Sequence, residues 1–210
     1  MKFFLLCITT FFSATFFVFA ADSSGNRADS FIMLGSSSGI HPATIIAPPT
    51  RVGLLLGSDW MVGIDSGSSS YSDSSGSSKA TATYSNQGLI ARYFIGNSFN
   101  VLAGYHMRNY DASVTSTDSS GTATLDLKAQ ANVATFTIGN HWLWDWGIWI
   151  GFDWLLLGNA VSTKSEATVT SSGTVGDISE AKKDAEAIGD LVNAISTAGG
   201  FLVMSVGFAF

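Results

Sequence analysis

Eight ionisable side chains recur in the alternating segments of this chain, and their types could form ion pairs or carry protons. Four are cations, three are carboxylates and one is a histidine, whose charge changes closest to neutral pH. An enclosed charge is costly unless an opposite charge lies beside it. We therefore predict one polar network, enclosed inside the fold, with these members: Arg51, Asp65, Arg92, His106, Arg108, Asp126, Lys128 and Asp153.

Acyl-transfer catalysis would need a nucleophile, a histidine base and an orienting carboxylate within reach of one another. We expect His41 to be a solvated residue of an outer loop, His141 to lie in a turn among tryptophans, and His106 to point inward. None of the three belongs to a His-x-Ser arrangement. The one cysteine, Cys7, lies near the start of the chain, and the histidines are scattered, so we also expect no metal site and no cofactor. The sequence therefore predicts a protein that is not an enzyme.

The elements that must position these residues are strands of alternating polarity. In the last segment, large apolar residues at positions 202, 204, 206, 208 and 210 alternate with mostly small ones. Such a strand carries an apolar stripe on one face and a compact stripe on the other. Comparable alternation predicts eight strands, at about 28–36, 49–56, 59–69, 79–95, 100–115, 122–138, 146–158 and 199–210.

The strand at 122–138 has the most polar face. Leu125, Leu127, Ala129, Ala131 and Val133 alternate there with Asp126, Lys128, Gln130 and Asn132, and we expect the second set to face a polar interior. Short connections (57–59, 96–98 and 139–141) alternate with longer or more polar ones (37–48, 69–79, 116–121 and 159–198). Strict alternation of this kind is typical of membrane barrels, which have short turns at one end and longer loops at the other.

The N-terminal residues have the form of an export signal. Lys2 precedes an apolar run, and Val18-Phe19-Ala20 is an acceptable cleavage site, so we expect residues 1–20 to be removed and 21–27 to form an N-terminal segment. Without Lys2 the chain keeps 9 basic and 16 acidic residues, which argues against nucleic acid as a partner. A retained transmembrane helix at residues 1–20 is the alternative.

The C-terminal Gly207-Phe208-Ala209-Phe210 resembles the Gly-aromatic-x-Phe ending of bacterial outer-membrane β-barrels. The strand pattern resembles the small eight-stranded barrels of the OmpA/OmpX type. This resemblance implies export to a Gram-negative outer membrane, contact with its lipids including lipopolysaccharide, and insertion by the barrel-assembly machinery through Gly207, Phe208 and Phe210. A periplasmic aromatic girdle is then expected from Trp60, Phe99, Trp142, Trp144 and Trp146.

We therefore predict an all-β fold, an eight-stranded antiparallel up-and-down transmembrane β-barrel over residues 28–210. One amphipathic helix, at about 177–195, is inserted in the last outer loop, where it covers the rim, binds a partner or lies in the outer-leaflet interface. The predicted function is non-catalytic, with a salt-bridged closed lumen and a structural or surface-interaction role involving an unknown extracellular partner. A narrow ion or solute channel and an outer-membrane lipid-modifying enzyme remain alternatives. A soluble periplasmic β-sandwich is disfavoured by the charged face of 122–138.

Overall fold

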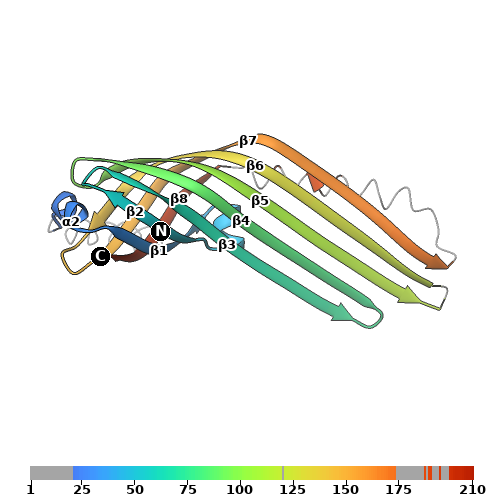
Figure 1. The fold of residues 1–210 in the computed structure, drawn as a ribbon. Coiled ribbons are helices and arrows are strands. Elements are labelled where there is room, and N and C mark those ends of the chain that lie inside the picture. Colours follow the sequence, from blue (N-terminus) through green and yellow to red (C-terminus); the bar gives the residue numbers. More distant parts are fainter. Residues whose placement is uncertain (1–20, 120, 174–186, 188, 191–193, 195–198) are drawn as a thin grey trace, which may run out of the picture.

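Eight antiparallel strands close into a barrel in the computed structural model, which describes residues 21–119, 121–173, 187, 189, 190, 194 and 199–210. Each strand pairs with the next in the sequence, and β8 pairs with β1 to close the ring (Figure 1). This confirms the predicted fold class. The strands are β1 (Ile32–Ile40), β2 (Thr50–Leu56), β3 (Trp60–Ser75), β4 (Ser78–Ile95), β5 (Phe99–Asp118), β6 (Gly121–Leu143), β7 (Ile148–Gly173) and β8 (Gly200–Ala209).

Two short helices precede β1 and β2, namely α2 (Ser23–Asp29) and α3 (Pro42–Ile46). No helix in the described part of the chain is both long and apolar enough to cross a bilayer. The predicted signal at 1–20 lies outside the described residues. The predicted helix at 177–195 lies mostly outside them as well, although residues 187, 189, 190 and 194 are helical.

The strands differ greatly in length. β1, β2 and β8 have 9, 7 and 10 residues, close to the length that crosses a bilayer, whereas β6 and β7 have 23 and 26. Pairing with β2 stops at Ser66 of β3, and pairing with β8 stops at Leu156 of β7. Beyond these residues β3–β7 continue as one sheet, here called the protruding sheet (Figure 1).

The segments predicted as loops at 69–79 and 116–121, and the loop predicted at 159–198 as far as residue 173, are largely strand, so these predictions were wrong. Gly76 and Ser77 form a two-residue turn between β3 and β4, and Gly76 takes the positive φ of 57° that such a turn requires. These segments are rich in serine and threonine and carry little apolar alternation. Backbone pairing and cross-strand contacts, such as the 3.1 Å hydrogen bond between the hydroxyls of Thr115 and Thr124, hold them instead.

Two strand boundaries at the other end of the barrel also differ from prediction. β6 continues through the expected turn at 139–141, and the chain reverses at 144–147, where Gly147 has a φ of 88°. β1 begins at Ile32 rather than at residue 28, because residues 23–29 form α2. The Asp22 side chain caps this helix by accepting a hydrogen bond from the Gly25 N–H. The end that carries the turns 57–59, 96–98 and 144–147 is called the turn end.

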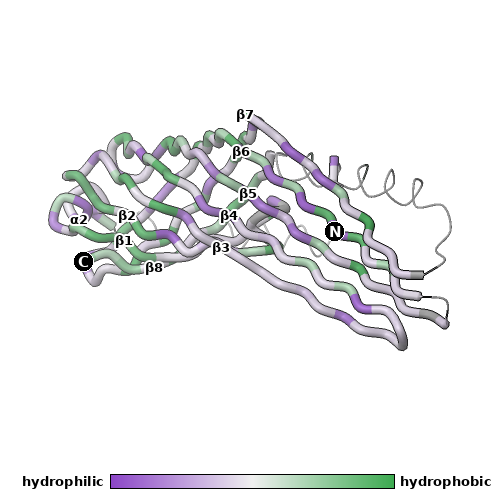
Figure 2. Tube along the Cα trace, turned by 45° about the vertical axis from the view of Figure 1, so that its right-hand side comes forward, coloured by the Kyte–Doolittle hydropathy of each residue, from purple (hydrophilic) through white to green (hydrophobic). Residues whose placement is uncertain are grey.

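The outside of the closed barrel is apolar all the way round. Its hydrophobic residues concentrate on the closed part, and paler, more polar colours cover the tip of the protruding sheet (Figure 2). Strand register places these outward hydrophobic residues next to one another on successive strands, from β8 through β1 to β7. We call this surface the apolar belt; it comprises Phe208, Val206, Leu34, Val52, Leu54, Val62, Ile64, Leu89, Tyr105, Phe136, Leu155 and Leu157, all more than one-third exposed.

The polarity of the two faces of β6 inverts along the strand. Odd-numbered residues face inward throughout, from Leu127 to Leu143. Near the turn end the inward residues include Thr135 and Thr137, whereas in the protruding sheet they are Leu127, Ala129 and Ala131. Lys128 is exposed and Asp126 is half-exposed, so the prediction that these two face the interior was wrong. The outward face of the protruding sheet is polar while its inward face is apolar, which makes polarity a misleading guide to direction.

Candidate functional site

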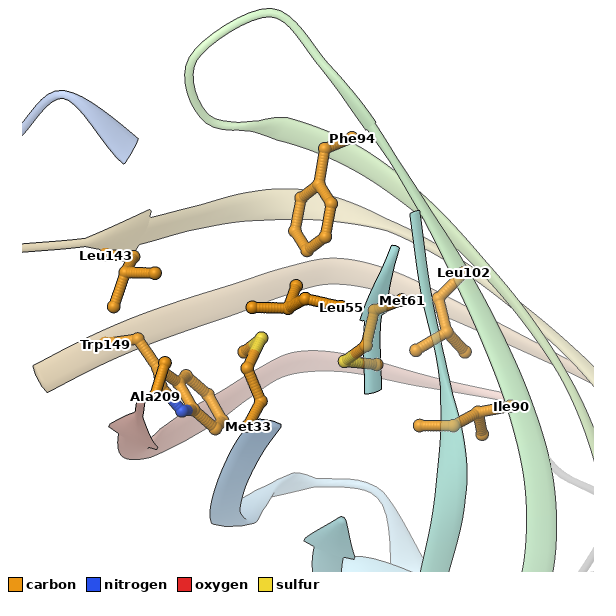
Figure 3. Packing of buried hydrophobic residues seen from close by; sticks show 9 residues of the cluster. All are labelled: Met33, Leu55, Met61, Ile90, Phe94, Leu102, Leu143, Trp149 and Ala209. Atoms are coloured by element: carbon orange, nitrogen blue, oxygen red, sulfur yellow. The ribbon is translucent and has the colours of Figure 1, made fainter. Parts of the chain in front are cut away.

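An apolar layer crosses the lumen near the turn end, and every strand of the barrel contributes to it. The side chains converge from opposite walls (Figure 3). Trp149 is its largest member and is 1% exposed. Its ring lies against Gly35 and Gly207, where any Cβ would collide with it, and its Nε1–H donates to the Leu34 carbonyl at 3.2 Å. The members are Met33, Leu55, Met61, Ile90, Phe94, Leu102, Leu143, Trp149 and Ala209.

The helix α2 covers this layer at the turn end, and Arg27 fastens it there. The Arg27 guanidinium is fully buried and donates to three turn carbonyls, those of Ser58 at 2.7 Å, Gly96 at 2.9 Å and Asn97 at 3.0 Å. It also lies 4.1 Å from the centre of the Phe94 ring, a cation–π distance. Arg27 therefore links the β2–β3 turn and the β4–β5 turn to α2 through hydrogen bonds.

Two further residues of α2 bind the end of β6. The Ser23 hydroxyl accepts the Leu143 N–H at 3.0 Å, and the Asn26 amide donates to the Leu143 carbonyl at 2.8 Å. Burial lowers the pKa of Arg27 to about 10, against the opposing fields of Asp59 and Asp22, so it remains a cation at neutral pH. Sequence reasoning missed this helix; the available signal was an Asp22 cap followed by a lone arginine.

The lumen also contains two ion pairs, and one of them reaches the level of the apolar layer, because Arg92 lies in register with Met61 and Leu102. Arg51 and Asp65 are register partners on β2 and β3 and form a bidentate pair, with both nitrogen–oxygen distances at 2.8 Å. Arg92 on β4 reaches across the lumen to Asp153 on β7 at 3.3 Å. The structure thus brings together four of the predicted residues as two separate pairs.

The histidines lie deeper than the sequence suggested. His106 is 6% exposed and its ring lies against Gly88, where a Cβ would collide with it. His141 was expected in a turn but is completely buried between the rings of Phe94 and Trp149, at centroid distances of 5.4 Å and 4.8 Å. His41 was expected to be solvated but is 1% exposed and packs against β8, so both expectations were wrong.

A polar cavity of about 40 Å³ lies among these side chains. Its lining includes Arg51, Asp65, His106, Arg108 and Asp153. Such a volume holds a few water-sized ligands and is too small for an organic substrate. Within the described residues no three His, Cys, Asp or Glu side chains are grouped to hold a metal ion.

The remaining predicted residues lie at the two surfaces. The structure places Asp126 and Lys128 on the outer face of β6, away from the lumen. The expected girdle residues all lie at or near the turn end. Trp60 is the first residue of β3 and Phe99 the first of β5. Trp142 is the next-to-last residue of β6, and Trp144 and Trp146 are in the turn that follows.

The C-terminal residues complete the closure of the barrel. Phe208 is 57% exposed in the apolar belt, and the Phe210 carbonyl accepts hydrogen bonds from the Phe31 and Ile32 N–H groups, both at 2.9 Å. Gly207 faces inward, where a Cβ would overlap the Leu34 carbonyl. The alternation predicted for β8 is confirmed, because Val203, Ser205 and Ala209 are buried while the intervening large residues are exposed.

Comparison with known proteins gives a distant structural similarity only. No family model and no curated protein matches the sequence. Crystal structures of CarO and CarO2 from Acinetobacter baumannii are each 11% identical to this chain, with TM-scores of 0.44. The matches cover 87% and 86% of this chain and 99% of each of those chains.

Proposed function

We propose that this protein is a non-catalytic β-barrel of a bacterial outer membrane, with a lumen that is closed to ions and solutes. The apolar belt supports the membrane location. Its residues, such as Leu89 at 68% exposed and Phe208 at 57%, form a continuous surface far larger than the apolar patches that water-soluble monomers expose. A hydrocarbon environment makes that surface favourable, and a closed barrel leaves no unpaired strand edge within it.

The apolar layer is the observation that carries the closed lumen. Met61, Leu143 and Trp149 are at most 1% exposed, and α2 covers the same end of the barrel. An ion crossing this layer would lose most of its hydration to closely packed apolar side chains and would meet only a few buried polar groups there, those of Arg92, Asn100 and His141, at a cost of several kcal/mol. The alternative of a narrow channel is disfavoured by the same layer, although a polar cavity lies beyond it.

The protruding sheet supports a role at the cell surface. Its outward face carries Lys128 and Lys164 beside Asp111 and Glu166 in neighbouring register positions. The two lysines lie beyond the apolar belt on β6 and β7, eight residues from Phe136 and seven from Leu157, on the side where we expect the phosphate groups of lipopolysaccharide. We propose lipopolysaccharide as the lipid contact and an extracellular molecule as the partner of the protruding sheet.

Planar-bilayer recording of the purified protein tests the closed lumen. We expect a heat-modifiable band on gels, which marks a folded barrel, and no steady conductance. Trp149→Ala, which removes the largest side chain of the apolar layer, should introduce a small conductance, whereas Trp146→Ala at an exposed position should not. Steady conductance of the unaltered protein would refute the closed lumen in favour of a channel, and a band that heating does not shift would refute the barrel in a membrane.

Overexpression followed by mass spectrometry of lipid A tests the absence of catalysis. We expect the acylation pattern to be unchanged. A loss or gain of an acyl chain that disappears with His106→Gln or His41→Gln would instead identify a lipid-modifying enzyme.

A further inference from the structure

The buried charges of the lumen do not balance. Among the described residues, three arginines (Arg51, Arg92 and Arg108) are buried on the strands, but only two carboxylates, Asp65 and Asp153, are buried with them. Each carboxylate is already held by an arginine. One positive charge, that of Arg108, therefore has no buried carboxylate beside it in the described part of the barrel.

Arg108 occupies a separate position from the two ion pairs. It pairs in register with Asn86, one inward-facing step further from the turn end than His106 and Asp65. Arg108 is 4% exposed, and its Nε donates only to a neutral acceptor, the Asn86 Oδ1 at 3.3 Å. A buried cation with one long, neutral hydrogen bond destabilises the fold unless a negative charge reaches it.

The groups around Arg108 are donors without partners. The Arg108 Nη1 and the Tyr84 hydroxyl are both buried and make no hydrogen bond to the described residues. Tyr84 is 5% exposed and close enough to Arg108 to interact electrostatically. Small apolar side chains, Ala129 and Ala131, complete the surroundings on β6 and provide no acceptor.

We propose that the lumen binds one monovalent, halide-sized anion beside Arg108. The excess of one positive charge selects a monovalent ion. Arg108 and Asn86 line the cavity of about 40 Å³ together with Asp65 and Asp153, whose charges are already held by Arg51 and Arg92, and this volume admits a chloride or bromide ion and excludes organic anions. Donor groups without acceptors favour an anion over water, because water would leave the charge uncompensated. The closed barrel does not depend on this site, so a negative result for anion binding would leave the proposed function intact.

Thermal unfolding in halide and non-halide salts tests the site. The protein purified in a non-ionic detergent is heated in sodium chloride, sodium bromide or sodium gluconate at constant sodium concentration, and the folded fraction is measured by gel mobility. We expect the midpoint to rise by about 5 °C in chloride or bromide relative to gluconate, because a ligand that binds only the folded state stabilises it by mass action. Equal midpoints in halide and gluconate would overturn the proposal.

Two variants and one diffraction experiment locate the effect. Arg108→Gln should abolish the halide dependence, whereas Lys79→Gln, which removes an exposed cation, should preserve it. A halide response that survives in Arg108→Gln would refute the site. Should Arg108→Gln fail to fold, the unaltered protein still decides, since crystals grown in bromide must show anomalous density within hydrogen-bond distance of the Arg108 Nη1. Density only at other positions would count against the proposal.

Discussion

Asp65→Asn should be among the most destabilising polar substitutions in the described part of the barrel. Asp65 accepts two hydrogen bonds from Arg51, each with a nitrogen–oxygen distance of 2.8 Å. The Asp65 side chain is 5% exposed and that of Arg51 is 8% exposed. Asparagine keeps the size of the side chain but removes its charge, which leaves Arg51 as a buried cation facing an amide. Breaking a buried ion pair on one side costs about 3–5 kcal/mol.

Urea unfolding of the protein in detergent micelles, followed by tryptophan fluorescence, measures this cost. For an m-value of about 2 kcal/mol/M, the midpoint of Asp65→Asn should fall by about 2 M urea. The double variant Arg51→Leu/Asp65→Leu should regain most of the lost stability, because it removes both buried charges and replaces them with apolar volume. Asp153→Asn should cost less than Asp65→Asn, since the Arg92–Asp153 contact is longer at 3.3 Å.

Two results would refute this reasoning. One is an Asp65→Asn variant within about 1 kcal/mol of the unaltered protein, which would mean that water reaches and solvates Arg51. The other is a double variant that is less stable than Asp65→Asn, which would mean that the pair contributes net stability beyond its desolvation cost.

Three further predictions concern the cap, the closure and the direction of β6. Arg27→Met removes three hydrogen bonds from a charged donor, each contributing about 1.5–3 kcal/mol, so amide exchange in residues 23–29 should accelerate at least about tenfold by mass spectrometry. Gly207→Val places a Cβ against the Leu34 carbonyl, so the folded, heat-modifiable band should be lost; a normal band would contradict the close approach. On intact cells, Lys128→Cys should react with a membrane-impermeant maleimide and Leu127→Cys should not, and the reverse result would restore the face assignment made from the sequence.

The barrel class and most of the inward and outward assignments near the turn end could be predicted from the sequence. Alternation along β8 separates Val206 and Phe208 from Ser205 and Gly207, and the same separation holds on β2–β5, because the outward residues there are large and apolar while the inward ones fit a packed interior. On β6 the same rule fails. Its outward side chains change from apolar to polar along one strand while their direction stays the same, and nothing local in the sequence marks that point.

Which buried groups meet depends on the closed fold and cannot be read from the sequence. Arg51 and Asp65 are 14 residues apart and pair through strand register, while Arg92 and Asp153 are 61 apart and meet across the lumen. The place of Arg27 depends on carbonyls from two turns that the closed barrel brings together. Alternation is a property of neighbouring residues and can be read from the chain, whereas barrel closure sets distances between residues that the chain order leaves far apart.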